Sequence, residues 1–224
     1  MKTAIILAAR REKESEIPYP LKAFAPDLCL LDRTIGILRD LHFSNILIVV
    51  GYKAEMFRKY EADDVTLIVN KDYEFTASMG SLALAKDYVK EDFLLIESDT
   101  FYERRLLEQL AARTEGNCLS MTEESGSGDE CFMETKNGFV TKITKDRHRV
   151  CHFEGEMIGV SRITLDTFEM LVNAWEHASN PYLNYEYLLM DVTEPLDRPV
   201  IVLKNLIWGD VDCEEDFKKL QNVI

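Results

Sequence analysis

The chain has 224 residues, of which 46% are hydrophobic and 29% are charged, and its formal net charge is −14 at pH 7. This length allows one large domain or two small ones with a full hydrophobic core, and the composition is that of a soluble globular protein. The strong negative charge argues against a nucleic-acid backbone as partner, and the sequence has no apolar run of transmembrane length, which argues against membrane insertion.

Short apolar runs alternate with helical patterns through the first half of the chain. Buried strands are predicted at residues 3–9, 46–51, 65–70 and 93–96. Helical spacing or composition lies between and after them, at residues 32–42, 54–60, 80–90 and 103–113. Strands separated by helices in this way indicate right-handed βαβ units, so the predicted fold is α/β, with a Rossmann-like, mostly parallel sheet flanked by helices.

The second half begins with shorter, extended segments and predicts a β-rich extension of that fold. Residues 122–130 are polar and rich in Gly and Ser, which predicts a mobile loop. Asn137-Gly138 predicts a hairpin turn between extended segments at 131–135 and 139–144. Further extended segments are predicted at 150–153, 157–163, 200–203 and 206–211, and helices at 165–177, 182–191 and 214–223.

The first strand is followed by a basic segment that contains Arg10, Arg11, Lys13 and Lys22. A buried first strand that delivers a basic loop to the carboxyl edge of a sheet is how α/β proteins hold phosphorylated ligands. An ordinary loop with solvated charges explains the same residues equally well.

Two aspartates lie at strand ends that are far apart in the sequence. Asp99 follows the strand at 93–96, and Asp212 follows the strand at 206–211. Mg²⁺ prefers oxygen ligands and commonly uses one or two carboxylates together with substrate phosphates, so the pair is a candidate metal site. The alternatives are that Asp99 caps the next helix and that Asp212 is one of several acids at a helix start.

The beginning of the chain resembles the nucleotidyltransferases that activate sugar phosphates or small phospho-alcohols. Their pattern is a strand, L-A-A-G, a Gly-rich basic loop and P-K, and Leu7-Ala8-Ala9 and Pro20-Leu21-Lys22 match it in outline. Arg10 stands where the pattern has glycine, and the loop contains no glycine. Arginine and lysine side chains would therefore replace part of the backbone contact that glycines allow with a triphosphate.

The resemblance is closest to the phosphocholine and 2-aminoethylphosphonate cytidylyltransferases and covers nearly the full length of the chain. Asn70 and the later Ser81-Leu82 are similar to that family's base-recognising segment, N-x-x-Y…S-L. Gly80 permits a close backbone approach, and Ser81 offers a hydroxyl and an amide to a pyrimidine. An N-terminal helix position explains Ser81 equally well.

The resemblance implies a cytidylyltransferase that uses CTP, Mg²⁺ and a small zwitterionic acceptor, either phosphocholine or 2-aminoethylphosphonate. An acceptor oxygen would attack the α-phosphorus of CTP and expel pyrophosphate. The implied metal ligands are Asp99 and Asp212, and the implied catalytic residues are Arg10, Lys22 and Asp99. The implied nucleotide-binding residues are Leu7, Ala8, Ala9, Arg10, Arg11, Lys13, Lys22, Asn70, Gly80, Ser81 and Asp99.

Four further residues are candidates for acceptor binding. Tyr185 and Glu186 place a carboxylate beside aromatic rings, which suits an ammonium group, although an amphipathic helix with Tyr185 in the core explains them as well. Lys142 and Lys145 lie on or just after a predicted strand and suit the anionic end of the acceptor. Edge lysines that discourage aggregation are the alternative for both.

We therefore expect a single nucleotidyltransferase domain over residues 1–224. Within it, residues 1–113 form the nucleotide-binding core, 114–163 a β-rich extension or lid, and 164–224 the acceptor side with a closing strand and helix. The alternatives are a sugar-1-phosphate nucleotidyltransferase that uses UTP or another nucleotide, and a nucleotide-binding protein without turnover. Five cysteines without a close C-x-x-C pair favour a reduced, cytoplasmic setting, and a homo-oligomer is compatible with the helix patterns.

Overall fold

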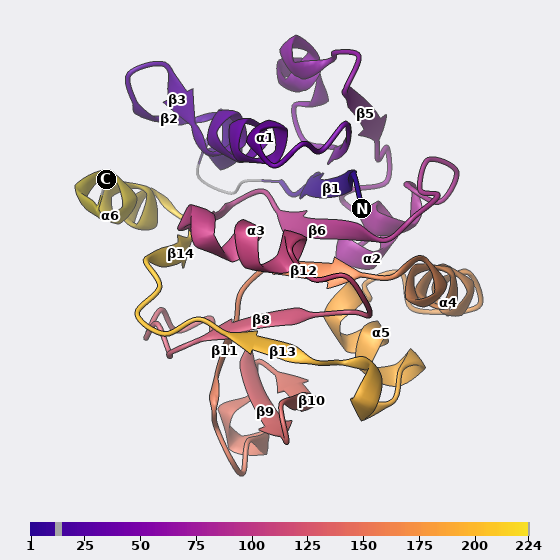
Figure 1. Cartoon of the computed structure of the whole chain (residues 1–224). Helices are drawn as coiled ribbons and strands as arrows, with labels where there is room; N and C mark the ends of the chain where they lie inside the picture. Colours follow the sequence, from indigo (N-terminus) through magenta and orange to yellow (C-terminus); the bar gives the residue numbers. More distant parts are fainter. Residues whose placement is uncertain (12–14, 224) are drawn as a thin grey trace.

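A computed structural model describes residues 1–11 and 15–223. Its first sheet runs through the middle of the molecule with strand order β12-β6-β1-β4-β5 (Figure 1). The four strands from β6 to β5 are parallel, and β12 pairs antiparallel with β6 at one edge. In sheet order the strands span Val160–Ile163, Phe93–Glu97, Thr3–Ala8, Asn45–Val50 and Val65–Val69.

Helices cover both faces of this sheet because its strands are apolar on both sides. On β1, Ala4, Ile6 and Ala8 face the cluster that contains α1 and α3, whereas Ile5 faces the cluster that contains α2, α4 and α5. A strand buried on both faces reads as a continuous apolar run, as Thr3–Ala8 does. The helices are α1 Leu30–Asp40, α2 Ser78–Ala83, α3 Arg104–Ala111, α4 Leu165–Glu176, α5 Tyr185–Val192 and α6 Glu214–Val223.

A second sheet lies beside the first, and its β9–β10 hairpin forms the end of the molecule opposite α1 (Figure 1). Asn137 and Gly138 both have positive φ at the hairpin turn, as a two-residue turn of this kind requires. The strand order is β10-β9-β11-β8-β13, and only the β13–β8 pair is parallel. These strands span Phe139–Thr144, Phe132–Lys136, Gly155–Met157, Leu119–Thr122 and Val200–Val202.

Two small two-stranded sheets complete the fold. One pairs β14, Trp208–Asp210, with β7, Thr100–Tyr102, and brings the C-terminal region to the end of β6. The other pairs β2, Ala23–Ala25, with β3, Leu28–Cys29, next to α1. Short 3-10 helices occupy Tyr19–Leu21, Ala54–Tyr60, Arg147–Arg149 and Pro195–Asp197.

The structure confirms the predicted fold class and corrects two predicted elements. The helix predicted at 80–90 begins earlier and ends at Ala83, after which the chain continues with i to i+3 hydrogen bonds. Leu82, Ala85 and Val89 are all buried. The predicted apolar face therefore exists, although only its first part belongs to an α-helix. The strand predicted at 150–153 is absent from the described chain, because the Glu134 carboxylate accepts the amides of Cys151 and His152 in a bend. In the described ranges, no helix is long and apolar enough to cross a membrane.

Candidate active site

A cavity of about 380 Å³ opens at the carboxyl ends of β1 and β6, between the two sheets. β1 and β6 are adjacent and parallel, with Leu7 opposite Glu97, so the segments that leave both strands enter the same space. Residues from α2, α5 and the second sheet close the other sides. The cavity is therefore built from parts of the chain that are far apart in sequence.

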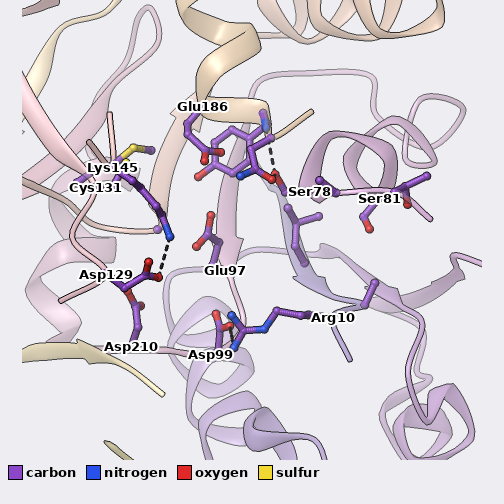
Figure 2. A pocket seen from close by; sticks show the side chains of 18 of the residues that line it. Arg10, Ser78, Ser81, Glu97, Asp99, Asp129, Cys131, Lys145, Glu186 and Asp210 are labelled. Atoms are coloured by element: carbon purple, nitrogen blue, oxygen red, sulfur yellow. Dashed lines mark hydrogen bonds and ion pairs between the residues drawn. The ribbon is translucent and has the colours of Figure 1, made fainter. Parts of the chain in front are cut away.

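The structure brings Asp99 and Asp212 together around Arg10. One guanidinium nitrogen of Arg10, Nη2, lies 3.0 Å from Asp99 Oδ2 and 2.6 Å from Asp212 Oδ1. Figure 2 shows Arg10 reaching across the mouth of the cavity toward Asp99. The amide of Val211 donates to the Asp99 carbonyl at 2.9 Å, which anchors the segment that carries Asp212.

Asp99 does not cap the following helix. β7 intervenes, and the N-cap of α3 is Glu103. The cap alternative for Asp99 is therefore wrong, and its carboxylate lines the cavity instead.

Burial and like charges raise the pKa values of the carboxyls at this end of the cavity. The pKa of Asp99 is raised by burial and by Asp212, against the opposing effect of Arg10. Burial, followed by the Asp99 charge, raises the pKa of Asp210 to about 7, although the Thr100 hydroxyl donates to its Oδ1 at 2.6 Å. Burying a carboxylate disfavours its charged form, and a neighbouring carboxylate adds to that effect.

The two converging aspartates fit a divalent cation. Both carboxylate oxygens lie within 3.0 Å of one point, the position of Arg10 Nη2. Oxygen ligands of this kind suit Mg²⁺, which commonly takes one or two carboxylates and completes its shell with water and phosphate oxygens. Within the described ranges, no group of three or more His, Cys, Asp or Glu side chains forms a metal cage. Asp99 and Asp212 would therefore hold such an ion together with a bound phosphate.

The basic segment after β1 is only partly at the cavity. Arg10 and Arg11 line it, and Arg11 Nη1 donates to Glu74 Oε1 at 2.6 Å. Lys22 lies elsewhere, paired with Glu214 and 4.6 Å from the centre of the Phe217 ring. Lys13 falls outside the described residues. Of the L-A-A segment, Leu7 and Ala9 line the cavity, whereas Ala8 is in the core.

The predicted base-recognising segment forms one wall of the cavity. Ser81 lines it from the middle of α2 and accepts a 3.0 Å hydrogen bond from Asn70 Nδ2. Asn70 is buried behind Ser81 and also donates to Thr76 Oγ1 at 3.2 Å, so it positions two lining hydroxyls and does not itself line the cavity. A Cβ on Gly80 would lie 2.6 Å from Thr76 Cβ, so this glycine makes room for Thr76.

The predicted acceptor residues Tyr185, Glu186 and Lys145 meet at the inner end of the cavity. The Ser78 hydroxyl accepts from the Tyr185 amide at 3.0 Å, which fixes the start of α5 against α2. Lys145 donates to Asp129 Oδ2 at 2.7 Å. Lys142 is not among the lining residues; its Nζ donates to the Arg149 carbonyl at 2.9 Å and lies 3.6 Å from Glu134.

Sequence reasoning missed several acidic residues of the cavity, above all Glu97. Burial, Glu186 and Asp99 raise the pKa of Glu97 well above its ordinary value. A Cβ on Gly159 would lie 2.6 Å from Glu97 Oε2, so this glycine leaves room for the carboxylate. The signal that singles out Asp99, a carboxylate at the end of a buried strand, applies equally to Glu97, which is the last residue of β6. The other missed carboxylates, Asp129, Glu156 and Asp210, reach the cavity only through tertiary packing.

The sequence is similar to parts of two larger curated enzymes. It is 30% identical over 127 residues to the CMP-5'-(3-aminopropyl)phosphonate synthase of Streptomyces rubellomurinus, a match that covers 52% of this chain and 20% of the relative. It is 25% identical over its whole length to 44% of the bifunctional IPC transferase and DIPP synthase of Archaeoglobus fulgidus. The chain thus spans less than half the length of either relative. No family model matches it.

The fold is also that of a solved cytidylyltransferase. The CTP:phosphocholine cytidylyltransferase of Streptococcus pneumoniae superposes with a TM-score of 0.79 and 21% identity, over 100% of this chain and 99% of that one. Together these matches confirm the predicted resemblance to CTP-using nucleotidyltransferases, and the structural match confirms the fold.

Proposed function

We propose that this chain is a Mg²⁺-dependent cytidylyltransferase that transfers CMP from CTP to a small phosphorylated or phosphonate amino-alcohol, such as phosphocholine or 2-aminoethylphosphonate. The observation that carries the proposal is the convergence of Asp99 and Asp212 on one nitrogen of Arg10 at the cavity mouth. The names of the first relative and of the solved structure support cytidine as the base and an amine-bearing acceptor.

The reaction is an in-line displacement at phosphorus. An oxygen of the acceptor's phosphate or phosphonate forms a bond to the α-phosphorus of CTP, the bond from that phosphorus to the oxygen bridging toward the β-phosphate breaks, and pyrophosphate leaves with the bonding electrons. Such a reaction depends on positioning and on charge neutralisation more than on a strong acid or base. Bound Mg²⁺ would supply charge neutralisation at the reacting phosphates.

Each part of the cavity has a role in this proposal. Asp99 and Asp212 hold the metal, and Arg10 exchanges its two carboxylate partners for phosphate oxygens when the nucleotide enters. Arg11 meets the outer phosphates. The hydroxyls of Thr76 and Ser81, held by Asn70, provide hydrogen-bonding groups for the nucleoside.

The experiment is a pyrophosphate-release assay with the full chain. CTP, UTP and GTP are each combined with 2-aminoethylphosphonate, phosphoethanolamine, phosphocholine or glucose 1-phosphate, in Mg²⁺ or in EDTA. We expect release to require Mg²⁺ and a phospho-amine, and to be faster with CTP than with the other nucleotides by roughly tenfold or more.

Other results would replace the proposal with a specific alternative. Release from UTP and glucose 1-phosphate would identify a sugar-1-phosphate nucleotidyltransferase. Calorimetric binding of a nucleotide without release under any condition would identify a binding protein.

A further inference from the structure

The inner end of the cavity gathers more carboxyl groups than basic side chains. Six carboxylates and three basic side chains line the cavity as a whole. Each of the three bases is engaged by a carboxylate: Arg10 by Asp99 and Asp212, Arg11 by Glu74, and Lys145 by Asp129. In the described part of the chain, no ion pair reaches Glu97, Glu156 or Glu186.

Two of these three side chains are buried, which makes their lack of an ion-pair partner costly. Glu156 and Glu186 are only 3% and 8% exposed. In Figure 2 the carboxylates of Glu97 and Glu186 point into the same part of the cavity. Buried charges in proteins are normally paired or bound to a cation, because desolvation otherwise disfavours them. The arrangement is therefore complementary to a positively charged ligand.

A second observation points to a ligand at the same place. Tyr185 is completely buried, yet in the described residues its hydroxyl has no hydrogen-bond partner of ordinary geometry. Burial and the charges of Glu97 and Glu186 raise the pKa of this hydroxyl, and Glu97 is near enough to accept from it through a long contact. Buried polar groups are nearly always satisfied, so the hydroxyl oxygen, which can still accept a hydrogen bond, favours a donor from a group in the cavity.

The lining favours a cation that donates hydrogen bonds. Carboxylate oxygens and a tyrosine oxygen accept from N–H groups, and a primary ammonium offers three of them. A trimethylammonium offers none and is recognised mainly by several aromatic faces. Tyr73 and Tyr185 are the only aromatic side chains among the described lining residues, and Tyr73 packs so closely on Gly51 that a Cβ there would lie 2.6 Å from it.

We propose that Glu97, Glu186 and the Tyr185 hydroxyl bind the primary ammonium end of the acceptor, so that the substrates are short aminoalkyl phosphonates or phosphates and not their trimethylammonium counterparts. This inference rests on the proposed function and names its substrate class. Gly159 belongs to the same site, because it leaves the space in which the Glu97 carboxylate sits.

The test is calorimetric binding to the full chain, which needs no turnover. The matched ligands are 2-aminoethylphosphonate, its N,N,N-trimethyl derivative, and ethylphosphonate, which lacks the amine. We expect the primary amine to bind at least about tenfold more tightly than either of the other two, because only it donates to the buried acceptors.

Variants assign that preference to the named residues. Glu97→Gln and Glu186→Gln should each weaken binding of 2-aminoethylphosphonate by about tenfold and leave ethylphosphonate unchanged. Glu169→Gln, an exposed carboxylate on α4, is the matched control and should change neither. Thermal unfolding of each variant verifies that it is folded.

The inference and the proposed function fail in different ways. Equal or tighter binding of the trimethyl ligand, no binding of any of the three, or an unchanged preference in both folded variants would overturn the inference. Pyrophosphate release with phosphocholine would then leave the proposed function standing. A clear preference for the primary amine without any pyrophosphate release would instead retain this binding site and reject the cytidylyltransferase.

Discussion

The two ends of the cavity differ in how their carboxyl groups are partnered. At the mouth, Arg10 stands between Asp99 and Asp212 and neutralises them from within the chain. At the inner end, Glu97, Glu156 and Glu186 have no such internal cation in the described residues. The contrast teaches that a ligand at the mouth must displace Arg10 from its two carboxylate partners. At the inner end, the proposed ammonium ligand would meet carboxyl groups that are outside any ion pair of the described chain.

The largest expected effect comes from removing a carboxylate at the mouth. If the proposed function holds, Asp99→Asn or Asp212→Asn should lower kcat by about 10²–10³-fold, because each would remove a carboxylate that holds the proposed metal. The measurement is pyrophosphate release at saturating CTP. Asp87→Asn, at an exposed position, is the control. Near-normal turnover in a folded variant would remove that aspartate from the metal role.

The next prediction tests whether Arg10 occupies the position that a divalent metal ion would take. In Arg10→Ala, the free protein should bind Mn²⁺ roughly tenfold more tightly, because the guanidinium no longer competes for the two carboxylates. Electron paramagnetic resonance of free Mn²⁺ measures the affinity without any turnover. Arg11→Ala removes an equivalent charge that contacts Glu74, and it should have little effect. Unchanged Mn²⁺ affinity in Arg10→Ala would show that the guanidinium and the metal do not compete.

A substitution at Gly159 disturbs the inner end alone. The new Cβ of Gly159→Ala would lie within 3 Å of three Glu97 side-chain atoms, so that side chain must move. We expect a loss of about 1–2 kcal/mol of unfolding free energy and a severalfold weaker affinity for 2-aminoethylphosphonate. Urea unfolding and calorimetry measure the two effects. Gly36→Ala, where no atom lies within 4 Å, should be neutral or stabilising.

The smallest effect is a dependence of stability on pH at the inner end. Burial raises the pKa of Glu186 above 4.5, so the folded protein holds this proton more tightly than the unfolded chain does. The stability from this group is complete below the ordinary pKa and is lost as the pH rises through the raised value.

Glu186→Gln should therefore gain stability relative to the unsubstituted protein between pH 5 and pH 8. Urea midpoints at the two pH values measure the difference, and Glu169→Gln provides the reference. A constant difference between Glu186→Gln and the unsubstituted protein would contradict the raised pKa.

The parallel sheet was predictable because each of its strands is a continuous apolar run with helical patterns between. The predicted ranges 46–51 and 65–70 differ from β4 and β5 by a single residue at one or both ends. β7 and β2 were missed because they are three residues long and carry no periodicity of their own. Their pairing depends on tertiary contacts that local sequence does not encode.

Within the site, the positions of charged residues near strand ends predicted which side chains lie at the cavity, but not which ion pairs they form. They singled out Asp99 and Asp212, which the structure brings together. They also singled out Lys22, which instead pairs with Glu214, a contact between residues 192 positions apart. Glu97 was missed although it is the last residue of β6, because its place in the cavity depends on the space that Gly159 leaves, which the local sequence does not show. Charge alone does not say which ion pairs form.

The pairing of β14 with β7 has a consequence for biosynthesis. Thr100 and Asp210 are joined by a hydrogen bond across 110 positions, and Asp212 follows directly. On the ribosome, the parallel strands of the first sheet emerge long before this segment, so a nascent chain can assemble its nucleotide wall while the second aspartate is still unsynthesised. The two aspartates therefore meet only after most of the chain has been made, and an unfinished chain lacks their arrangement around Arg10.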